Sequence, residues 1–402
     1  MIVTAIFTVV GFIIVLGFLG NYLFKKTGIP DIIVLLCLGL LLGPVFHVVD
    51  PSVFRDVSQL FASLALMILL FEGGLNLNIY KVFQESPRAV LLATLVVITS
   101  MIITSVFTSF FWGWSLLQGL LLGAMIGGSS SSIVVPLVRK VNVGEKIVTL
   151  MSLESAFTDA LTVVIGITII QLLVSPAADT LYTISHGIAS AFSIGAMLGL
   201  LLGVIWLKML RLLKEESYRN ILTLAIVFLL YSFVQSLGGN GAISSLMFGL
   251  VLGNAKPISK IIKAKQEMKT EKAMKEFHSE ISFLVRTFFF VYLGLIVMVN
   301  DMHIVFLSIL LSSLLLIGRL FSVFLATLKE PTLKKNRDLM GMMLPRGLAA
   351  AVLSQLPIAY GLKNANMYSD IVFTVIIVTV LICTIGVFGI SKKMKREKVE
   401  KK

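Results

Sequence analysis

The chain has 402 residues, of which 57% are hydrophobic and 14% charged, and its formal net charge at pH 7 is +13. Soluble domains carry about 25% charged residues, so this composition excludes an ordinary soluble protein. Apolar stretches of about 20 residues, the length that crosses a bilayer as a helix, recur along the chain. The basic residues lie between these stretches, which favours a membrane topology signal over a nucleic-acid partner.

The apolar stretches predict an all-α polytopic membrane protein with about 13 transmembrane helices. The first stretch lacks a basic n-region and a small-residue cleavage site, so we expect it to be retained as a helix rather than removed as a signal peptide. The predicted spans are 2–23, 30–46, 57–79, 88–111, 115–138, 147–173, 181–207, 219–236, 241–254, 281–300, 303–328, 338–360 and 368–391.

Lys and Arg residues are distributed unevenly over the predicted connections. Nearly all of the 34 basic residues fall in the odd-numbered connections or in the tail after Ser391, and the even-numbered connections hold only Arg55 and Lys363. Because basic loops stay in the cytoplasm, this alternation predicts an outside N-terminus and a cytoplasmic C-terminus. The basic connection over residues 254–280 is expected to be a cytoplasmic amphipathic helix that touches anionic lipid.

A few ionisable residues lie well inside the predicted spans, where each charge costs about 2.5–3.5 kcal/mol at the bilayer centre. They are Glu72, Glu154, Asp159, Arg286, Arg319 and Arg346. Such groups are expected to be paired or to lie along an aqueous path. Glu154 and Asp159 are five residues apart, roughly 140° around a helix, so they do not form a carboxylate dyad.

Different partners are therefore expected for the two acids of the sixth span. Ser155 shares a helix face with Asp159, and carboxylate and hydroxyl oxygens together suit a hard cation. Asp159 is thus the candidate exchangeable acid, with Ser155 as a second ligand of Na⁺ or K⁺. Glu154 requires a buried basic partner, and Arg319 lies at a matching depth, so we predict a structural ion pair between them.

Two predicted spans contain helix-breaking residues. The stretch "MIGGSSSSIVVPLV" joins two glycines, four serines and Pro136, and "MMLPRGLAAAV" places Pro345 and Gly347 on either side of Arg346. Broken helices survive in a bilayer only where protein or water satisfies the backbone, and a pair of them in two halves of a chain indicates a transporter site. The two segments are seven spans apart and cross in opposite directions, as an inverted repeat requires.

No enzyme chemistry is expected from this sequence. His47, His186 and His303 fall at predicted outer edges and His278 falls in the cytoplasmic connection, so none can activate a buried nucleophile. The run "GGSSSS" lacks the Lys and the spacing of a phosphate-binding loop. Cys37 and Cys383 lie in apolar stretches and are expected to be small buried hydrophobes.

The motifs "LLFEGGLNLN", "GGSSSSIVVPLV", "LESAFTDALTVV", "GRLFSVF" and "MLPRGLAAAV" resemble those of the monovalent cation:proton antiporter superfamily, most closely its NhaP-type sodium/proton antiporters. The resemblance covers essentially the whole chain in order. It implies an inverted repeat with two crossed discontinuous helices and elevator-like alternating access. It also implies a homodimer in contact with membrane lipids. No cofactor is expected beyond the transported Na⁺, Li⁺ or K⁺ and H⁺.

The resemblance also implies roles for individual residues. Asp159 matches the ion-binding acid and Ser155 a ligand beside it, while Ser129 or Ser130 matches the ligand from the unwound helix. Candidate cation- and proton-binding residues are thus Asp159, Ser155, Ser129, Ser130, Glu72 and Thr158. Glu154 and Arg319 match a core salt bridge, and Arg346 matches the basic position of the second broken helix. Thr158 stands where relatives carry Asn or Asp, and the serine run stands where they carry Thr-Asp-Pro, which leaves the choice between Na⁺ and K⁺ open.

We expect one transmembrane transporter unit over residues 1–402. The ion-transport core is expected over residues 88–173 and 303–391, a dimerisation scaffold over 1–79 and 181–300, and a short cytoplasmic tail over 392–402. The predicted function is one-for-one exchange of protons for monovalent cations across the cell membrane, with Asp159 as the shared carboxylate. The alternatives are a sodium-coupled symporter for an organic anion, which needs a wider cavity, and a cation channel or a non-transporting membrane subunit.

Overall fold

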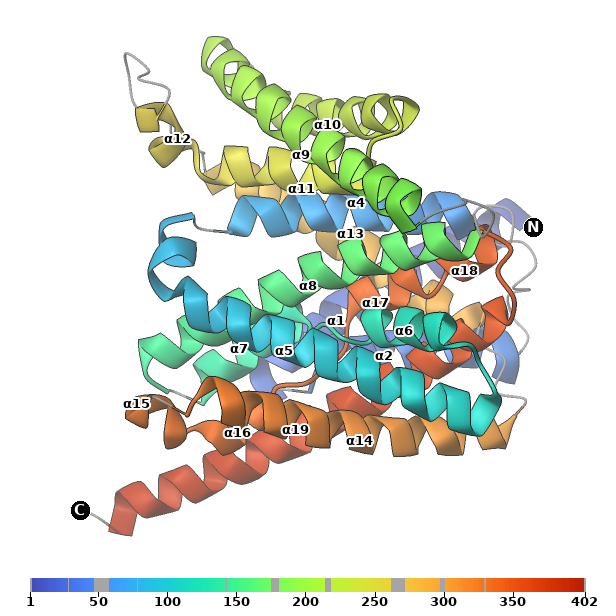
Figure 1. Cartoon of the computed structure of the whole chain (residues 1–402), viewed down its shortest axis with the longest axis vertical. Coiled ribbons are helices and arrows are strands. Elements are labelled where there is room, and N and C mark those ends of the chain that lie inside the picture. The colour runs from blue at the N-terminus through green and yellow to red at the C-terminus, as the bar shows by residue number, and fades with distance from the viewer. Residues whose placement is uncertain are drawn as a thin grey trace. The chain divides into compact units, whose positions relative to one another are not determined.

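A computed structural model describes residues 2–27, 29–46, 58–77, 79–141, 143–174, 181–213, 218–261, 272–296, 301–328 and 330–400. Within these ranges the regular structure is entirely helical (Figure 1). The predicted all-α class is confirmed. The predicted outer-edge residue His47 lies outside the described residues.

The described helices follow one another along the chain in this order. The first half of the chain contains α1 (Ile2–Thr27), α2 (Asp31–Leu40) continued by the π-helical turn η1 (Leu41–Val45), α4 (Ser58–Asn76), α5 (Ile79–Trp112), α6 (Leu116–Met125), α7 (Ser131–Lys140), α8 (Glu145–Val174) and α9 (Leu181–Leu212). The second half contains α10 (Arg219–Ser236), α11 (Gly241–Gly253), α12 (Ala255–Ile261), α13 (Lys272–Ile296), α14 (Met302–Ala326), α15 (Pro331–Lys334), α16 (Arg337–Met342), α17 (Leu348–Leu353), α18 (Leu356–Ala359) and α19 (Ala365–Glu400).

Seven of the described helices are long and apolar enough to cross a membrane: α5 from Pro87 onward, α8, α9 from Ala189 onward, α10, α13, α14 and α19 up to Lys393. Shorter apolar helices cover Val10–Phe24, Asp31–Val45, Leu60–Asn76, Leu116–Met125, Gly241–Gly253 and Leu348–Ala359. Every predicted span overlaps one of these helices, and the protein is a multi-pass membrane protein. The count of about 13 crossings stays a prediction.

Helix starts differ from the prediction in two places. α5 begins at Ile79 and runs through Pro87, although we expected a connection before residue 88. α13 begins at Lys272 rather than near residue 281, so the tenth predicted span and the end of the predicted amphipathic helix over residues 254–280, with His278, form one continuous helix. Polar residues hid both extensions, because hydropathy marks only the apolar part of a helix and not the polar turns that prolong it.

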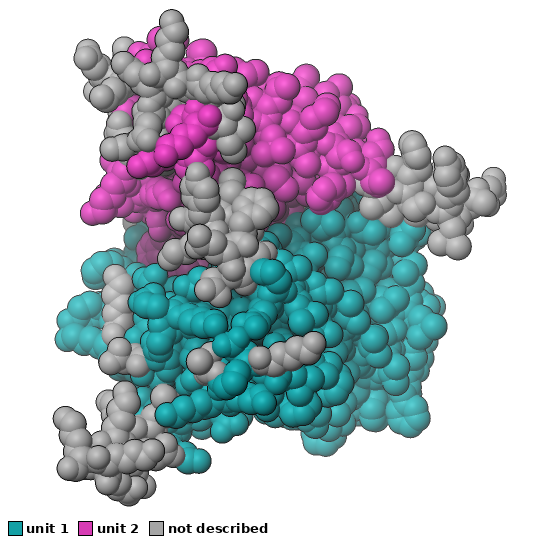
Figure 2. Space-filling view, turned by 60° about the vertical axis from the view of Figure 1, so that its left-hand side comes forward, with its two compact units in different colours: residues 1–62, 85–174, 287–402 teal, residues 63–84, 175–286 magenta. Residues whose placement is uncertain are grey.

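The chain divides into two compact units, coloured separately in Figure 2: residues 1–62, 85–174 and 287–402 form unit 1, and residues 63–84 and 175–286 form unit 2. Unit 1 contains the predicted core segments and also α1 and α2. In unit 1, α14 packs along α19 and α16, while α6 and α7 both pack against α8 (Figure 1). The functional division into transport and dimerisation parts stays a prediction.

Close helix packing in unit 1 depends on small residues, as expected where no hydrophobic driving force acts between helices in lipid. Gly39 of α2 and Gly294 of α13 face each other, so that a Cβ at Gly39 would overlap the Val291 carbonyl and a Cβ at Gly294 would overlap the Leu36 carbonyl. Any larger residue at either position would force the two backbones apart.

Unit 2 packs α9 along α11 and α10 against both. Its core contains Phe71 of α4 and Phe248 of α11, whose ring centroids are 5.9 Å apart. His278 belongs to this core, since it is only 2% exposed and its ring meets Phe71 edge-on with a centroid distance of 4.8 Å. The His278 ring thus packs as an aromatic side chain in this core. Its burial could not be inferred from the sequence, because the residues around it are basic.

Candidate cation site

Both predicted helix breaks are present, and they cross each other in unit 1. The first break is the non-helical stretch 126–130 between α6 and α7, and the second is 343–347 between α16 and α17. At the crossing, the backbone nitrogen of Ser130 donates a hydrogen bond to the Pro345 carbonyl oxygen at 2.7 Å. A Cβ at Gly347 would overlap the Ser130 side chain. Glycine is therefore required where the two backbones approach.

Arg346 joins the two breaks through its side chain. Its Nη1 donates to the carbonyl oxygens of Gly127 at 3.0 Å and Gly128 at 2.8 Å. Its backbone nitrogen donates to Thr379 Oγ1 of α19 at 3.1 Å. The guanidinium is fully buried, and its Nε and Nη2 have no hydrogen-bond partner among the described residues. Arg346 thus satisfies carbonyl groups that the first break leaves without helical partners.

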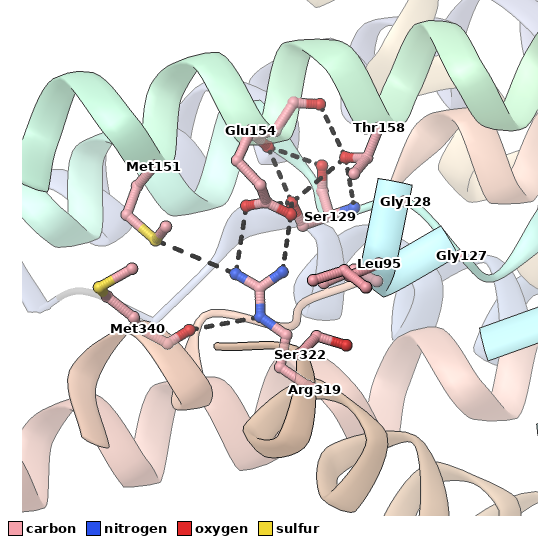
Figure 3. Close-up of polar contacts among 12 residues, drawn as sticks. Leu95, Gly127, Gly128, Ser129, Met151, Glu154, Thr158, Arg319, Ser322 and Met340 are labelled. Atoms are coloured by element: carbon pink, nitrogen blue, oxygen red, sulfur yellow. Dashed lines mark hydrogen bonds and ion pairs between the residues drawn. The ribbon is translucent and has the colours of Figure 1, made fainter. Parts of the chain in front are cut away.

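Glu154 and Arg319 form a buried bidentate ion pair between α8 and α14. Arg319 Nη1 lies 2.7 Å from Glu154 Oε1, Nη2 lies 3.1 Å from Oε2, and both side chains are completely buried. Arg319 Nε also donates to the Met340 carbonyl oxygen of α16 at 3.3 Å. Figure 3 shows the guanidinium pointing from α14 toward the carboxylate on α8. The arrangement neutralises both charges, as a buried pair requires.

Ser129 connects the first break to the same carboxylate. Its hydroxyl oxygen lies 3.2 Å from both oxygens of Glu154, and its backbone nitrogen donates to Thr158 Oγ1 at 3.1 Å (Figure 3). Its carbonyl oxygen accepts from Ser155 Oγ at 2.7 Å. Ser129, Ser155 and Thr158 are all fully buried. These bonds hold the non-helical stretch 126–130 against α8.

Asp159 has different surroundings from Glu154. It is half-buried, and its carboxylate oxygen Oδ2 accepts a hydrogen bond from Ser131 Oγ at 3.2 Å. Ser131 is the first residue of α7. No ion pair with a basic side chain occurs at this carboxylate among the described residues. Asp159 can therefore change its bound charge without breaking a salt bridge.

Glu72 of α4 belongs to unit 2, where it is half-buried. Its carboxylate lies beside Ser279 and Ser282 of α13 and interacts electrostatically with Arg286 of the same helix. This neighbourhood gives Glu72 a basic partner of its own within unit 2.

The structure thus brings together most of the residues that the sequence singles out. Glu154, Ser155, Thr158 and Asp159 lie on α8 against the first break, Arg319 meets Glu154, and Arg346 meets the break itself. Three contributors were not predicted: Ser131, the Met340 carbonyl and Thr379. No sequence signal separates Ser131 from its three serine neighbours, because the start of α7 decides which hydroxyl reaches Asp159.

Comparison with known proteins places this site in context. The family model described as "Sodium/hydrogen exchanger, transmembrane" matches residues 7–393. The chain is 27% identical over 367 residues to the K(+)/H(+) antiporter NhaP2 of Shewanella sp. strain ANA-3, covering 89% of this chain and 61% of that protein. It is 26% identical over 361 residues to the probable Na(+)/H(+) antiporter 2 of Methanocaldococcus jannaschii, covering 85% of this chain and 82% of that protein.

The fold is also that of a solved structure. The sodium proton antiporter MjNhaP1 from Methanocaldococcus jannaschii, determined at pH 8, superposes with a TM-score of 0.79 over 96% of each chain at 23% identity. The chain spans 61% of the length of its NhaP2 relative, so the two proteins are not equivalent throughout. Because the family model matches nearly the whole chain, this protein belongs to the transmembrane sodium/hydrogen exchanger family.

Proposed function

We propose that this protein exchanges protons for monovalent cations across a membrane, with Asp159 binding either ion in turn. The observation that carries the proposal is the contrast between the two acids of α8. Glu154 is fully buried and paired with Arg319, whereas Asp159 is half-buried and bonded, among the described residues, to a single hydroxyl. A carboxylate that lies beside hydroxyl oxygens and is not held in an ion pair among the described residues can bind either H⁺ or a hard cation, so the two ions compete for it.

The proposed site extends around Asp159 to hydroxyl groups on α8 and the first break. Ser155, Ser129, Ser130 and Thr158 supply oxygens. Glu72 belongs to unit 2 and is a separate candidate acid, whose titration would add a second proton. Ser155 donates its hydrogen to the Ser129 carbonyl, and the oxygen of such a hydroxyl keeps a lone pair for a cation. Glu154 and Arg319 act as a structural pair, and Arg346 holds the crossing.

The choice of cation is tested by transport. The relatives named above include a K(+)/H(+) antiporter and a probable Na(+)/H(+) antiporter. Purified protein in liposomes that contain a pH-sensitive dye would be challenged in turn with Na⁺, Li⁺, K⁺ and choline. We expect Na⁺ or Li⁺, and less strongly K⁺, to drive proton movement while choline does not. Equal signals with all four ions would overturn exchange, and a conductance far above carrier turnover would indicate a channel.

The organisation of the protein in the cell follows from the same proposal. We infer a homodimer in the cell membrane, in contact with lipid. We also infer an outside N-terminus and a cytoplasmic C-terminus, since the basic residues alternate between connections. Transport would involve residues 88–173 and 303–391, and dimer contacts would involve residues 1–79 and 181–300. Cysteine accessibility on each side of inverted and right-side-out vesicles tests the orientation.

A further inference from the structure

The four consecutive serines at the first break have four different sets of partners. Ser129 contacts Glu154, Ser155 and Thr158, and it is fully buried. Ser130 contributes its backbone nitrogen to the crossing and is packed against Gly347. The Ser132 hydroxyl lies 3.0 Å from the Ser130 hydroxyl. Only Ser131 bonds to the Asp159 carboxylate.

We propose that Ser131 is a ligand of the transported cation, which it shares with Asp159, and that cation affinity depends on this serine more than on its neighbours in the run. The inference rests on the exchange function proposed above. It assigns the role to a residue outside the group expected from the sequence, and it separates Ser131 from Ser132, which has the same chemistry one position later.

Geometry supports shared coordination. Oxygen ligands lie about 2.3–2.6 Å from a hard cation of calcium size. Two such ligands about 90° apart around one ion at about 2.4 Å are therefore about 3.4 Å from each other. The Ser131 Oγ and Asp159 Oδ2 atoms are 3.2 Å apart, which is close to that separation. A small movement would let both oxygens contact one Na⁺ ion.

The hydroxyl group also suits both loaded states. A serine hydroxyl has one hydrogen and two lone pairs. When Asp159 is ionised and no cation is bound, Ser131 donates its hydrogen to the carboxylate. When Asp159 is protonated, the carboxyl hydrogen can be donated to Ser131 Oγ instead. When a cation is bound, a lone pair on Oγ faces the ion and the hydrogen turns away, so every state has a bonding partner.

Both side chains are half-buried, whereas Ser129, Ser155 and Thr158 are fully buried. Ser131 and Asp159 are thus the more accessible pair at the break, as a group that exchanges its ion must be. Ser131 begins α7, a helix of ten residues, and a helix N-terminus stabilises the ionised form of a nearby carboxylate. The start of the helix therefore complements the charge that Asp159 carries when it binds a cation.

The test uses variants that differ in the hydroxyl while keeping the shape. Ser131→Thr and Ser131→Val have nearly the same outline, and only Thr retains the hydroxyl. Ser132→Ala is the matched control for loss of a serine hydroxyl in the same helix turn. The full-length proteins would be reconstituted, and two quantities measured: the Na⁺ concentration that half-saturates exchange, and the rise of the melting temperature with added Na⁺, which reports binding without transport.

We expect Ser131→Val to raise the half-saturating Na⁺ concentration about tenfold, or about 1.4 kcal/mol, and to reduce the Na⁺-induced rise of the melting temperature. Ser131→Thr and Ser132→Ala should stay within about threefold of the parent protein. Equal values for Ser131→Val and Ser131→Thr would overturn the inference while leaving exchange intact. A parent protein without cation-driven exchange would instead overturn the proposed function, and the inference with it.

Discussion

Two carboxylates on one helix have opposite surroundings at the residue scale. Glu154 is bonded to Arg319 and Ser129, whereas the hydrogen bond to the Asp159 carboxylate among the described residues comes from Ser131. Helix angle alone separated these acids in the sequence, because five residues turn a helix by roughly 140°. The partner of Glu154 followed from matching depths. The partner of Asp159 did not, because four identical serines give no basis for choosing one.

The buried ion pair gives the first prediction. Removing one partner of such a pair costs about 3–5 kcal/mol, because the other charge is left uncompensated. Glu154→Gln and Arg319→Gln should each lower the melting temperature strongly, and the double variant should lose less than the sum of the two. Thermal unfolding in detergent measures the three variants against the parent protein. Strictly additive losses would show that the pair contributes no coupling energy.

Crossed helix breaks organise the site at the element scale. The two stretches of glycine, serine and proline predicted the breaks, because these residues weaken or interrupt helices. The contacts between the breaks could not be predicted, since the Ser130–Pro345 bond and the Arg346–Gly127 bond join residues about half a chain apart. Hydropathy also placed the start of the tenth span near residue 281, although α13 runs without a break from Lys272.

Gly347 gives the second prediction. An added methyl group at this position would overlap the Ser130 side chain, and overpacking typically costs about 1–3 kcal/mol. Gly347→Ala should therefore lower the melting temperature and reduce the exchange rate. Gly389→Ala in α19 is the control, since its added Cβ would have nothing within 4 Å. A Gly347→Ala protein as stable as the Gly389→Ala protein would contradict the close approach seen at the crossing.

Helix ends in unit 1 give the third prediction. Glu330, which precedes α15, forms ion pairs with Arg88 of α5 and Lys146 of α8. Partly exposed pairs contribute about 0.2–1 kcal/mol each, so Glu330→Gln should lower the melting temperature slightly. The effect should shrink at high ionic strength, because salt screens exposed charges. Glu280→Gln, at an exposed acid of α13, serves as the control, and identical behaviour of the two variants would argue against the ion pairs.

Charge balance operates at the scale of the whole molecule. The proposed cycle uses one carboxylate, Asp159, which is neutralised either by H⁺ or by a monovalent cation. Thr158 cannot ionise at physiological pH, and Glu154 is paired with Arg319.

Family, fold class and many spans could be predicted from the sequence, since hydropathy and motifs indicate them. The sorting of residues into two compact units could not, because α1 and α2 show no sequence feature that assigns them to unit 1.

The fourth prediction follows from this balance. Exchange of one proton for one cation moves no net charge, whereas a charge that crosses the membrane gains or loses about 2.3 kcal/mol per 100 mV. Potassium and valinomycin would impose potentials of both signs on proteoliposomes, with Na⁺ as the driving cation. The exchange rate should be the same for both signs. A rate that rises with one sign and falls with the other would indicate a second titrating group, with Glu72 as the first candidate.

Competition between H⁺ and cation at Asp159 is the central claim, and the pH dependence of the half-saturating Na⁺ concentration tests it most directly. We expect this concentration to rise as the pH falls, approaching tenfold per pH unit where one proton must leave for each cation bound. The maximal rate should change much less, and Asp159→Asn, which keeps the size but loses the titratable group, should fold without exchanging. A half-saturating concentration that does not change with pH, or cation-driven proton movement by Asp159→Asn, would contradict the account.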